Sequence, residues 1–199
     1  MKAFNEKVIV EIGEPYEEQI SYGSLDLHID PQFNPTKYSK TIGKVVSAGH
    51  KTTGLAPGDI IAFHFGAIDI NPDDKKVAKG QYIIEYRDVF CEITQDGGVM
   101  AVGRWCVCEP VPTEIPEGYH LEEIQGSQYL ISPAGLVADT NFKVEYDDRV
   151  KVVSHPRGLY HGDIMFVPEN CNWDNYGRTI LGKRYFYVEE DLLLAKWDQ

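Results

Sequence analysis

A ten-residue segment, the repeated phrase, occurs twice in this chain and limits the possible folds more than any other feature of the sequence. GLAPGDIIAF covers residues 54–63 and GLYHGDIMFV covers residues 158–167, so Gly58 lies 104 positions before its counterpart Gly162. Pro57 with the glycine after it is typical of a turn, because proline presets a negative φ and glycine accepts a positive one. In both copies an aspartate and an apolar run follow. The phrase therefore predicts a turn and a strand that are built twice.

Three further segments recur in the same order as the phrase. KVIVEIGEP (7–15) matches RWCVCEP (104–110), GKVVSAG (43–49) matches VKVVSHP (150–156), and GQYIIEYRDVFCEI (80–93) matches GKRYFYVEEDLLLA (182–195). Their offsets of 97, 107 and 102 residues lie close to the 104 of the phrase. A duplication preserves the order of its elements. We therefore predict two domains, residues 1–98 and 99–199, with the boundary near the turn residues of TQDGG.

Helical periodicity is scarce in this sequence. Apolar residues rarely keep the i, i+3, i+4, i+7 spacing of an amphipathic helix, since Gly or Pro interrupts it. Short runs of β-branched and aromatic residues between turn residues are frequent instead, which predicts an all-β chain. The expected strands lie near residues 7–12, 44–48, 59–65, 81–86 and 90–94 in the first copy and near 104–109, 149–154, 163–167, 184–188 and 192–196 in the second.

The charge balance restricts the partners. Lys and Arg number 19 against 31 Asp and Glu, a formal net charge of −12. Such a chain repels phosphate backbones and anionic membrane surfaces, so we expect neither nucleic acid nor a membrane as a partner. Charges at Glu6, Lys7 and Glu11 argue against a signal peptide, and four cysteines are too few for a disulfide scaffold. We expect a cytoplasmic protein.

The order of these segments resembles that of the GroES-like co-chaperonins. In that family a strand, a long loop, a G-x-V-x-x-x-G segment, an x-G-D-I-x-x-F turn and a β-run with an acidic residue before apolar ones follow one another. The segments that carry the resemblance are 8–12, 43–49, 58–63 and 87–93 in the first copy and 104–109, 151–154, 162–166 and 189–195 in the second. The resemblance covers most of both halves and implies two tandem GroES-like irregular β-barrels.

The resemblance also implies a function. Members of the family form homo-oligomeric rings that cap a GroEL-type chaperonin and close the chamber in which client proteins fold, in a cycle driven by ATP. They have no catalytic residues of their own, so we expect neither an enzyme nor a cofactor or metal. A long loop after their first strand, disordered alone, docks an apolar tripeptide into a groove of the chaperonin. Because the loop orders on binding, its affinity is reduced and release stays possible.

The connection at residues 14–40 is the expected docking loop of the first copy, since it is too long for an ordinary hairpin. In the family, the tripeptide follows a glycine pair. By position, Gly23 and Ser24 correspond to that pair, and Leu25-Asp26-Leu27 corresponds to the tripeptide.

Asp26 departs from the family pattern, because a carboxylate in a dry groove must be paired or face water. In an extended segment Leu25, Leu27 and Ile29 share one face, and Asp26 lies on the other. A strand-like docking mode would therefore keep the charge out of the groove. The alternative is an edge strand whose apolar face packs on its own barrel.

The second copy has a still longer connection, at residues 111–148. Within it, Ala134-Gly135-Leu136-Val137 resembles the docking segment, although only one glycine of the pair is present. Gly135, Leu136 and Val137 are therefore candidate chaperonin-binding residues. The alternative is a packed Ω-loop that covers the barrel.

Other sites find less support in the sequence. Cys106 and Cys108 lie on one face of an expected strand, but no further soft ligands stand nearby, so we interpret them as core residues. Residues 69–80 begin like a calcium loop but lack its glycine and its final glutamate. None of the usual nucleophile, zinc-protease, phosphate-loop or dinucleotide motifs occurs. An alcohol dehydrogenase, which carries a GroES-like domain, would also need a nucleotide-binding domain.

A second function remains open at this point. The barrel could serve as a structural or binding module, for example a phage assembly protein, without docking to a chaperonin. The aspartate within Leu25-Asp26-Leu27 favours this alternative.

Overall fold

The structure is a computed structural model of the 199-residue chain. It describes residues 1–14, 19–22, 25–28, 39–68, 72–112, 117–124, 127–135, 137–139, 146–168, 177–180 and 182–196. Every strand pair in these ranges is antiparallel, and their only helices are short 3₁₀ turns. The prediction of an all-β chain is confirmed.

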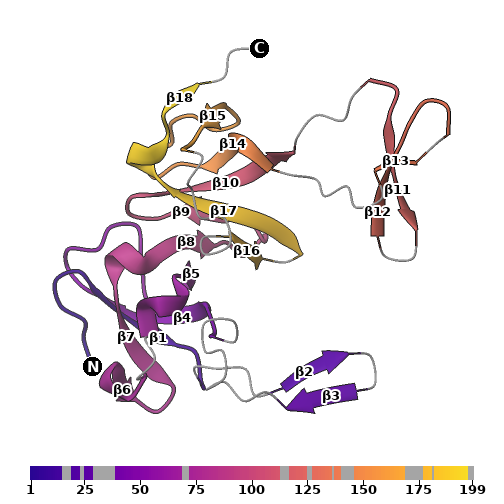
Figure 1. Cartoon of the computed structure of the whole chain (residues 1–199). Coiled ribbons are helices and arrows are strands. Elements are labelled where there is room, and N and C mark those ends of the chain that lie inside the picture. The colour runs from indigo at the N-terminus through magenta and orange to yellow at the C-terminus, as the bar shows by residue number, and fades with distance from the viewer. Residues whose placement is uncertain are drawn as a thin grey trace.

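The first large sheet is formed by strands from residues 7–101, in the order β6-β7-β1-β4-β5-β8-β9 (Figure 1). Its strands are β1 (Lys7–Glu11), β4 (Ile42–Ala48), β5 (Ile60–Phe63), β6 (Lys76–Ala78), β7 (Gln81–Glu85), β8 (Val89–Ile93) and β9 (Val99–Ala101). The 3₁₀ turns η1 (Phe65–Ile68), η2 (Pro72–Asp74) and η3 (Tyr86–Asp88) lie between them.

The second large sheet has the order β16-β17-β10-β14-β15-β18, which repeats the strand order of the first sheet without β9. Its strands are β10 (Trp105–Pro112), β14 (Tyr146–Ser154), β15 (Ile164–Phe166), β16 (Gly177–Ile180), β17 (Lys183–Glu189) and β18 (Ala195–Lys196), and η4 (Glu190–Leu192) precedes β18. Within the described residues neither sheet closes by pairing its outer strands, so the irregular barrels stay a prediction.

The strand register shows the repeat residue by residue and corrects its first offset. Val10 pairs with Val45 beside a β-bulge, and Cys108 pairs with Val152 beside a bulge at the same place. Val10 and Cys108 are 98 positions apart, one more than the sequence match indicated. The sequence match had set Lys7 against Arg104, whereas the register makes Trp105 the counterpart of Lys7.

For residues 81–93, the strand register also corrects the offset of 102 that the sequence match gave. Tyr82 lies opposite Val10, and Phe186 lies opposite Cys108, so these two counterparts are 104 positions apart instead of 102. The turns η3 and η4 have the same separation. The offset is therefore 104 at β5, β7 and η3, whereas Gly80 and Gly182, 102 positions apart, both lie directly before β7 or β17 with φ values of +69° and +80°.

The repeated phrase is explained by its backbone. Gly58 and Gly162 have φ values of +106° and +83°, where a side chain would be strained. Each glycine donates its N–H across the turn at 2.8 Å, Gly58 to the carbonyl of Val45 and Gly162 to that of Val152. The phrase is thus preserved because both sheets need the same tight turn before β5 and β15.

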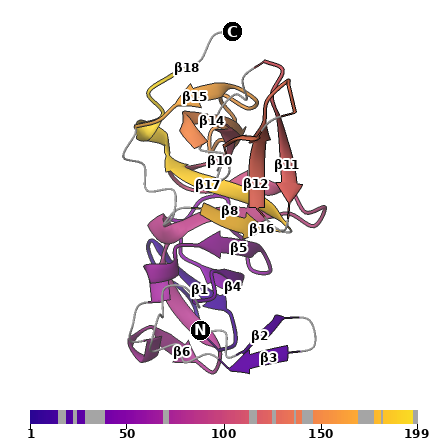
Figure 2. The same ribbon diagram turned by 45° about the vertical axis from the view of Figure 1, so that its right-hand side comes forward.

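A buried cluster joins the two sheets. Phe90 of β8 stacks on Tyr187 of β17, with ring centroids 4.2 Å apart and planes 9° apart, and meets Trp105 edge-on at 4.8 Å. The indole N–H of Trp105 also donates to the carbonyl of Arg87 at 2.7 Å. Both views show β8 and β17 lying next to each other (Figures 1 and 2). The two sheets therefore share apolar core across their junction.

Two small sheets lie outside the large ones. One is the hairpin of β2 (Gln19–Tyr22) and β3 (Leu25–His28). The other consists of β11 (His120–Ile124), β12 (Ser127–Ile131) and β13 (Val137–Asp139). In both views they lie on the same side of the molecule (Figures 1 and 2). One small sheet belongs to the connection that follows β1, and the other belongs to the connection that follows its counterpart β10.

Candidate functional site

The β2–β3 hairpin contains the expected docking tripeptide of the first half. Leu25 pairs with Tyr22 and Leu27 pairs with Ile20. Because directly paired positions share a face and alternate positions along a strand do too, these four apolar positions lie on one face of the ribbon. Asp26 alternates with the leucines and occupies the opposite face.

The hairpin differs from the expected edge strand. β3 pairs with β2 in a sheet of its own, and within the described residues neither strand is hydrogen bonded to the seven-stranded sheet. The candidate residues Gly23, Ser24, Ile29 and Leu136 lie outside the described residues.

The candidate segment of the second half lies at a turn between two strands. Gly135 donates its N–H to the carbonyl of Ser132 at 2.9 Å, has a φ of +74° and is exposed. Val137 begins β13 and pairs with Ile131, a buried residue of β12. The segment is therefore part of a three-stranded sheet, where the sequence had suggested a docking loop or an Ω-loop.

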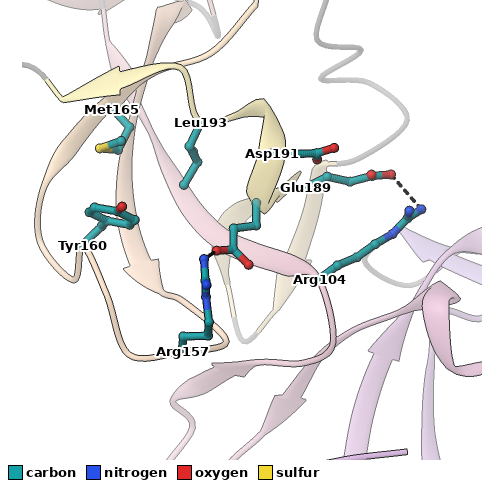
Figure 3. A pocket seen from close by; sticks show the side chains of 8 residues that line it. Arg104, Arg157, Tyr160, Met165, Glu189, Asp191 and Leu193 are labelled. Atoms are coloured by element: carbon teal, nitrogen blue, oxygen red, sulfur yellow. Dashed lines mark ion pairs between the residues drawn. The ribbon is translucent and has the colours of Figure 1, made fainter.

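A cavity of about 540 Å³ lies beside η4 of the second half. Tyr160, Met165 and Leu193 form its apolar side, and Figure 3 shows these three side chains grouped together. Met165 is buried and Leu193 is partly buried against the core cluster of the second sheet. The cavity therefore opens directly onto that core.

Charged groups form the other side of the cavity. Arg104 Nη2 lies 2.8 Å from Glu189 Oε1, and Arg157 forms an ion pair with Glu190 (Figure 3). His155 lies next to the pair of Arg157 and Glu190, and its Nδ1 accepts the backbone N–H of Arg157 at 3.1 Å. Its Nε2 lies 3.5 Å from Glu190 Oε1 and makes no hydrogen bond to any described residue. Burial, and then the Arg157 guanidinium, lower the pKa of His155.

The first half places a different residue at the equivalent position. Tyr86, 104 positions before Glu190, packs against the core cluster of the first sheet. Its hydroxyl donates to the carbonyl of Thr53 at 2.6 Å. This difference is hidden at the offset of 102, which sets Tyr86 against Val188. At the offset of 104 given by the strand register, Tyr86 aligns with Glu190. This exchange of tyrosine for glutamate is the signal in the sequence that marks the cavity.

The strand cysteines are part of the core. Cys106 and Cys108 are both fully buried in the cluster of the second sheet. Burial raises the pKa of the Cys106 thiol to about 12, which keeps it protonated at neutral pH. These thiols are therefore packing groups, as the sequence indicated.

Among the described residues, no group of three or more His, Cys, Asp or Glu side chains is placed to hold a metal ion. None of the helices in the described ranges is long and apolar enough to cross a membrane.

The sequence matches no protein-family model, and a search of curated proteins finds no similar sequence.

Proposed function

We propose that this protein is a tandem co-chaperonin lid: two GroES-like irregular β-barrels, residues 1–98 and 99–199, that assemble with further copies and cap a GroEL-type chaperonin. One observation carries the proposal. The connections after β1 and after its counterpart β10 each contain a small sheet outside the large one, on the same side of the molecule (Figure 1). Two such elements on one side are suited to contact a single partner surface.

The first hairpin supplies an apolar docking face. Its one face carries Leu25 and Leu27 together with Ile20 and Tyr22, while Asp26 lies on the other face. When such a ribbon lies on an apolar groove, the aliphatic side chains are buried and the carboxylate stays in water, which avoids its desolvation cost. The proposed lid acts by binding and needs no reaction chemistry of its own.

The test is nucleotide-dependent binding to a chaperonin. The purified full chain is mixed with a bacterial GroEL-type chaperonin, with and without ATP, and complexes are separated by sedimentation. We expect co-sedimentation only with nucleotide. The double variant Leu25→Asp, Leu27→Asp should lose it, because two carboxylates would enter the apolar contact.

A matched control changes the opposite face of the same hairpin. Ser21→Lys with His28→Asp adds the same number of charged groups on the opposite face, and no like charges are paired, because Ser21 lies opposite Asp26 and His28 opposite Gln19. This variant should bind as the natural chain does. Absence of any nucleotide-dependent complex, or equal losses in both double variants, would count against the docking face.

Asp26 favours a second candidate function, a structural or binding module such as a phage assembly protein. The register places Asp26 opposite Ser21 in a pair of hydrogen-bonded strands, whereas the loop of the family is disordered until it binds. In this case the double leucine variant would self-assemble as the natural chain does, and the chaperonin would bind neither the natural chain nor the variant. The same two experiments therefore separate the two functions.

A further inference from the structure

The cavity beside η4 lies at a place that the first half fills with its own side chains. In the first sheet, Leu55, Tyr86 and Val102 pack in or against the core cluster. At the offset of 104, Leu159 and Glu190 are the counterparts of Leu55 and Tyr86. Among the described residues, the core cluster of the second sheet contains neither of them, and none of its members takes the place of Val102. Leu159 is instead 44% exposed. The second core is therefore open where the first is closed.

The backbone shows that Tyr86 and Glu190 are equivalent positions. Each begins a 3₁₀ turn, Tyr86 in η3 and Glu190 in η4. Tyr86 donates its N–H to the carbonyl of Glu6 at 2.7 Å, and Glu190 donates its N–H to that of Arg104 at 2.8 Å. Glu6 and Arg104 are 98 positions apart, which is the offset of the strands that follow them. The exchange of tyrosine for glutamate is thus a change of side chain on the same backbone.

The apolar walls around this place are kept. Ile61 and Val89 are buried in the core cluster of the first sheet. Their counterparts, Met165 and Leu193, line the cavity together with Tyr160 (Figure 3). Protein interiors contain few voids larger than a water molecule. The cavity has a volume of about 540 Å³, within the range of roughly 300–1,000 Å³ that is typical of small-molecule sites.

The polar contact of Tyr86 also has a counterpart. The Tyr86 hydroxyl donates to the carbonyl of Thr53 at 2.6 Å and lies 3.0 Å from Thr53 Oγ1. At the offset of 104, Thr53 corresponds to Arg157, which forms an ion pair with Glu190. One polar pair therefore replaces another, but the glutamate has no ring. The second half keeps the polar end of this place and lacks the aromatic ring that fills it in the first half.

A buried polar atom on the same side is left without a partner. His155 is 5% exposed, and the register makes it the counterpart of Ala48. Its Nδ1 accepts the backbone N–H of Arg157, so the neutral ring carries its proton on Nε2. This Nε2 lies 3.5 Å from Glu190 Oε1 and hydrogen bonds to none of the described residues. Because buried polar groups are nearly always paired, this side of the cavity is incomplete.

Strained backbone occurs at the rim of the cavity. Tyr160 has a φ of +59°, which is unusual for a bulky residue. Its first-half counterpart, Ala56, is not among the described non-glycine residues with a positive φ. The Tyr160 ring meets the ring of His155 edge-on, with centroids 5.2 Å apart. Such strain clusters at sites that bind ligands, and here it is confined to the half that has the cavity.

The charges of the cavity restrict its ligand. Two of its carboxylates are already paired with guanidiniums, Glu189 with Arg104 and Glu190 with Arg157. Asp191 adds a third carboxylate. The excess of one negative charge opposes an anionic ligand, and the two ion pairs leave no concentrated charge to select a cation. A neutral ligand with an apolar body is therefore favoured.

We propose that this cavity binds a small neutral phenol. The ring packs against Met165, Leu193 and Tyr160, as the Tyr86 ring packs against the first core, and apolar cavities accept aromatic molecules in this way. The hydroxyl donates to the carboxylate of Glu190, which gives a charge-assisted hydrogen bond. The first repeat thus carries a phenol of its own, and the second takes one from solution.

This inference goes beyond the proposed lid and does not depend on it. The residues that line the cavity do not belong to the small sheets that carry the candidate docking residues. A chain that binds a phenol and no chaperonin would support the cavity site and refute the lid. A chain that binds a chaperonin and no phenol would do the reverse.

The probe is p-cresol, which is the tyrosine side chain as a free molecule. Calorimetric titration into the purified full chain should give a dissociation constant of about 0.1–1 mM, since a ligand of this size makes few contacts. Toluene, which lacks the hydroxyl, should bind about fivefold more weakly. Anionic 4-hydroxybenzoate should bind more weakly by about tenfold, because its carboxylate must be desolvated beside like charge.

A fourth compound distinguishes the source of the phenol. N-acetyltyrosinamide carries the same ring within a peptide backbone. If it binds more weakly than p-cresol, the ligand is a free phenol; if it binds more tightly, the same site takes the tyrosine of a peptide. Both results support a phenol site.

NMR and one substitution locate the probe. The methyl signals of Met165 and Leu193 should shift during the titration, with the dissociation constant that calorimetry gives. Glu190→Leu removes the acceptor, and the Arg157 side chain, already 66% exposed, is left in water. This variant should therefore fold, and it should bind p-cresol no more tightly than toluene.

Restoring the polar pair of the first half should close the site. In the double variant Glu190→Tyr, Arg157→Thr, the new ring should fill the cavity, abolish p-cresol binding and raise the melting temperature by several degrees, as cavity filling does. Glu117→Tyr adds the same ring at an exposed turn, and this control should bind p-cresol as the natural chain does. The proposal is overturned if p-cresol gives no saturable signal up to about 10 mM, or if the double variant binds it as tightly as the natural chain.

Discussion

Truncation of Phe90 tests whether the two sheets are one cooperative unit. The side chain is completely buried at the junction, where it stacks on Tyr187 and meets the edge of Trp105. Replacing a buried phenylalanine with alanine removes its transfer free energy and leaves a cavity, which costs about 3–5 kcal/mol. This loss is a large share of the about 5–15 kcal/mol that stabilises a typical domain.

The stacking itself should appear as coupling between the two rings. At a centroid distance of 4.2 Å, Phe90 and Tyr187 form a stacked pair, and such pairs contribute about 0.5–1.5 kcal/mol beyond the area they bury. We therefore expect the losses from Phe90→Ala and Tyr187→Ala to deviate from additivity by that amount in a double-mutant cycle. The assay is urea unfolding followed by circular dichroism and tryptophan fluorescence.

Phe63 provides the matched control. It is also completely buried, but it lies in the core cluster of the first sheet alone. Phe63→Ala should cost a similar free energy of unfolding and should be additive with Tyr187→Ala within about 0.5 kcal/mol. A shared core is refuted if Phe90→Ala costs less than about 1 kcal/mol, far below the range for a buried phenylalanine, or if the natural chain unfolds in two separate transitions.

Two further predictions concern pH and backbone conformation. The lowered pKa of His155 means that the unfolded chain takes up a proton at the ordinary value of 6.5 while the folded chain still resists it, so the free energy of unfolding should fall as the pH drops below about 6.5. His155→Gln should flatten this dependence, and melting temperatures from pH 7.5 to 5 measure both; an unchanged slope would contradict the assignment. Gly162→Ala should destabilise by about 1–2 kcal/mol through its positive φ alone, because an added Cβ meets nothing within 4 Å. Gly49→Ala should cost more, since its Cβ would clash with the carbonyl of Asn5, and chemical denaturation that ranks the two the other way would contradict this.

Much of the fold could be predicted because its signals are local. Turn glycines, alternating apolar runs and the repeated phrase depend on neighbouring residues, so they located the strands near Lys7–Glu11 and Gln81–Glu85 closely. Predictions failed where a pairing partner decides the structure. The run at residues 192–196 was expected as one strand, but it contains the end of η4 and only the short β18.

Less of the candidate site than of the fold could be predicted from the sequence. The candidate docking residues Leu25 and Leu27 were assigned by position, and their pairing with Tyr22 and Ile20 in a separate hairpin emerged only from the register. The cavity was missed altogether, because its walls come from segments that are distant in the chain. An alignment by similar letters had also separated Tyr86 from its counterpart Glu190.

The sequence by itself determined that this chain is all-β and that it repeats, since both properties follow from residue patterns a few positions long. Only the tertiary structure decided which strand lies beside which, where the offsets of 98 and 104 belong, and that the two halves share a core around Phe90. The physical reason is that hydrogen-bond register and side-chain packing depend on contacts between residues far apart in the chain. Similarity between the two halves of the sequence does not identify those contacts, and the strand pairing does.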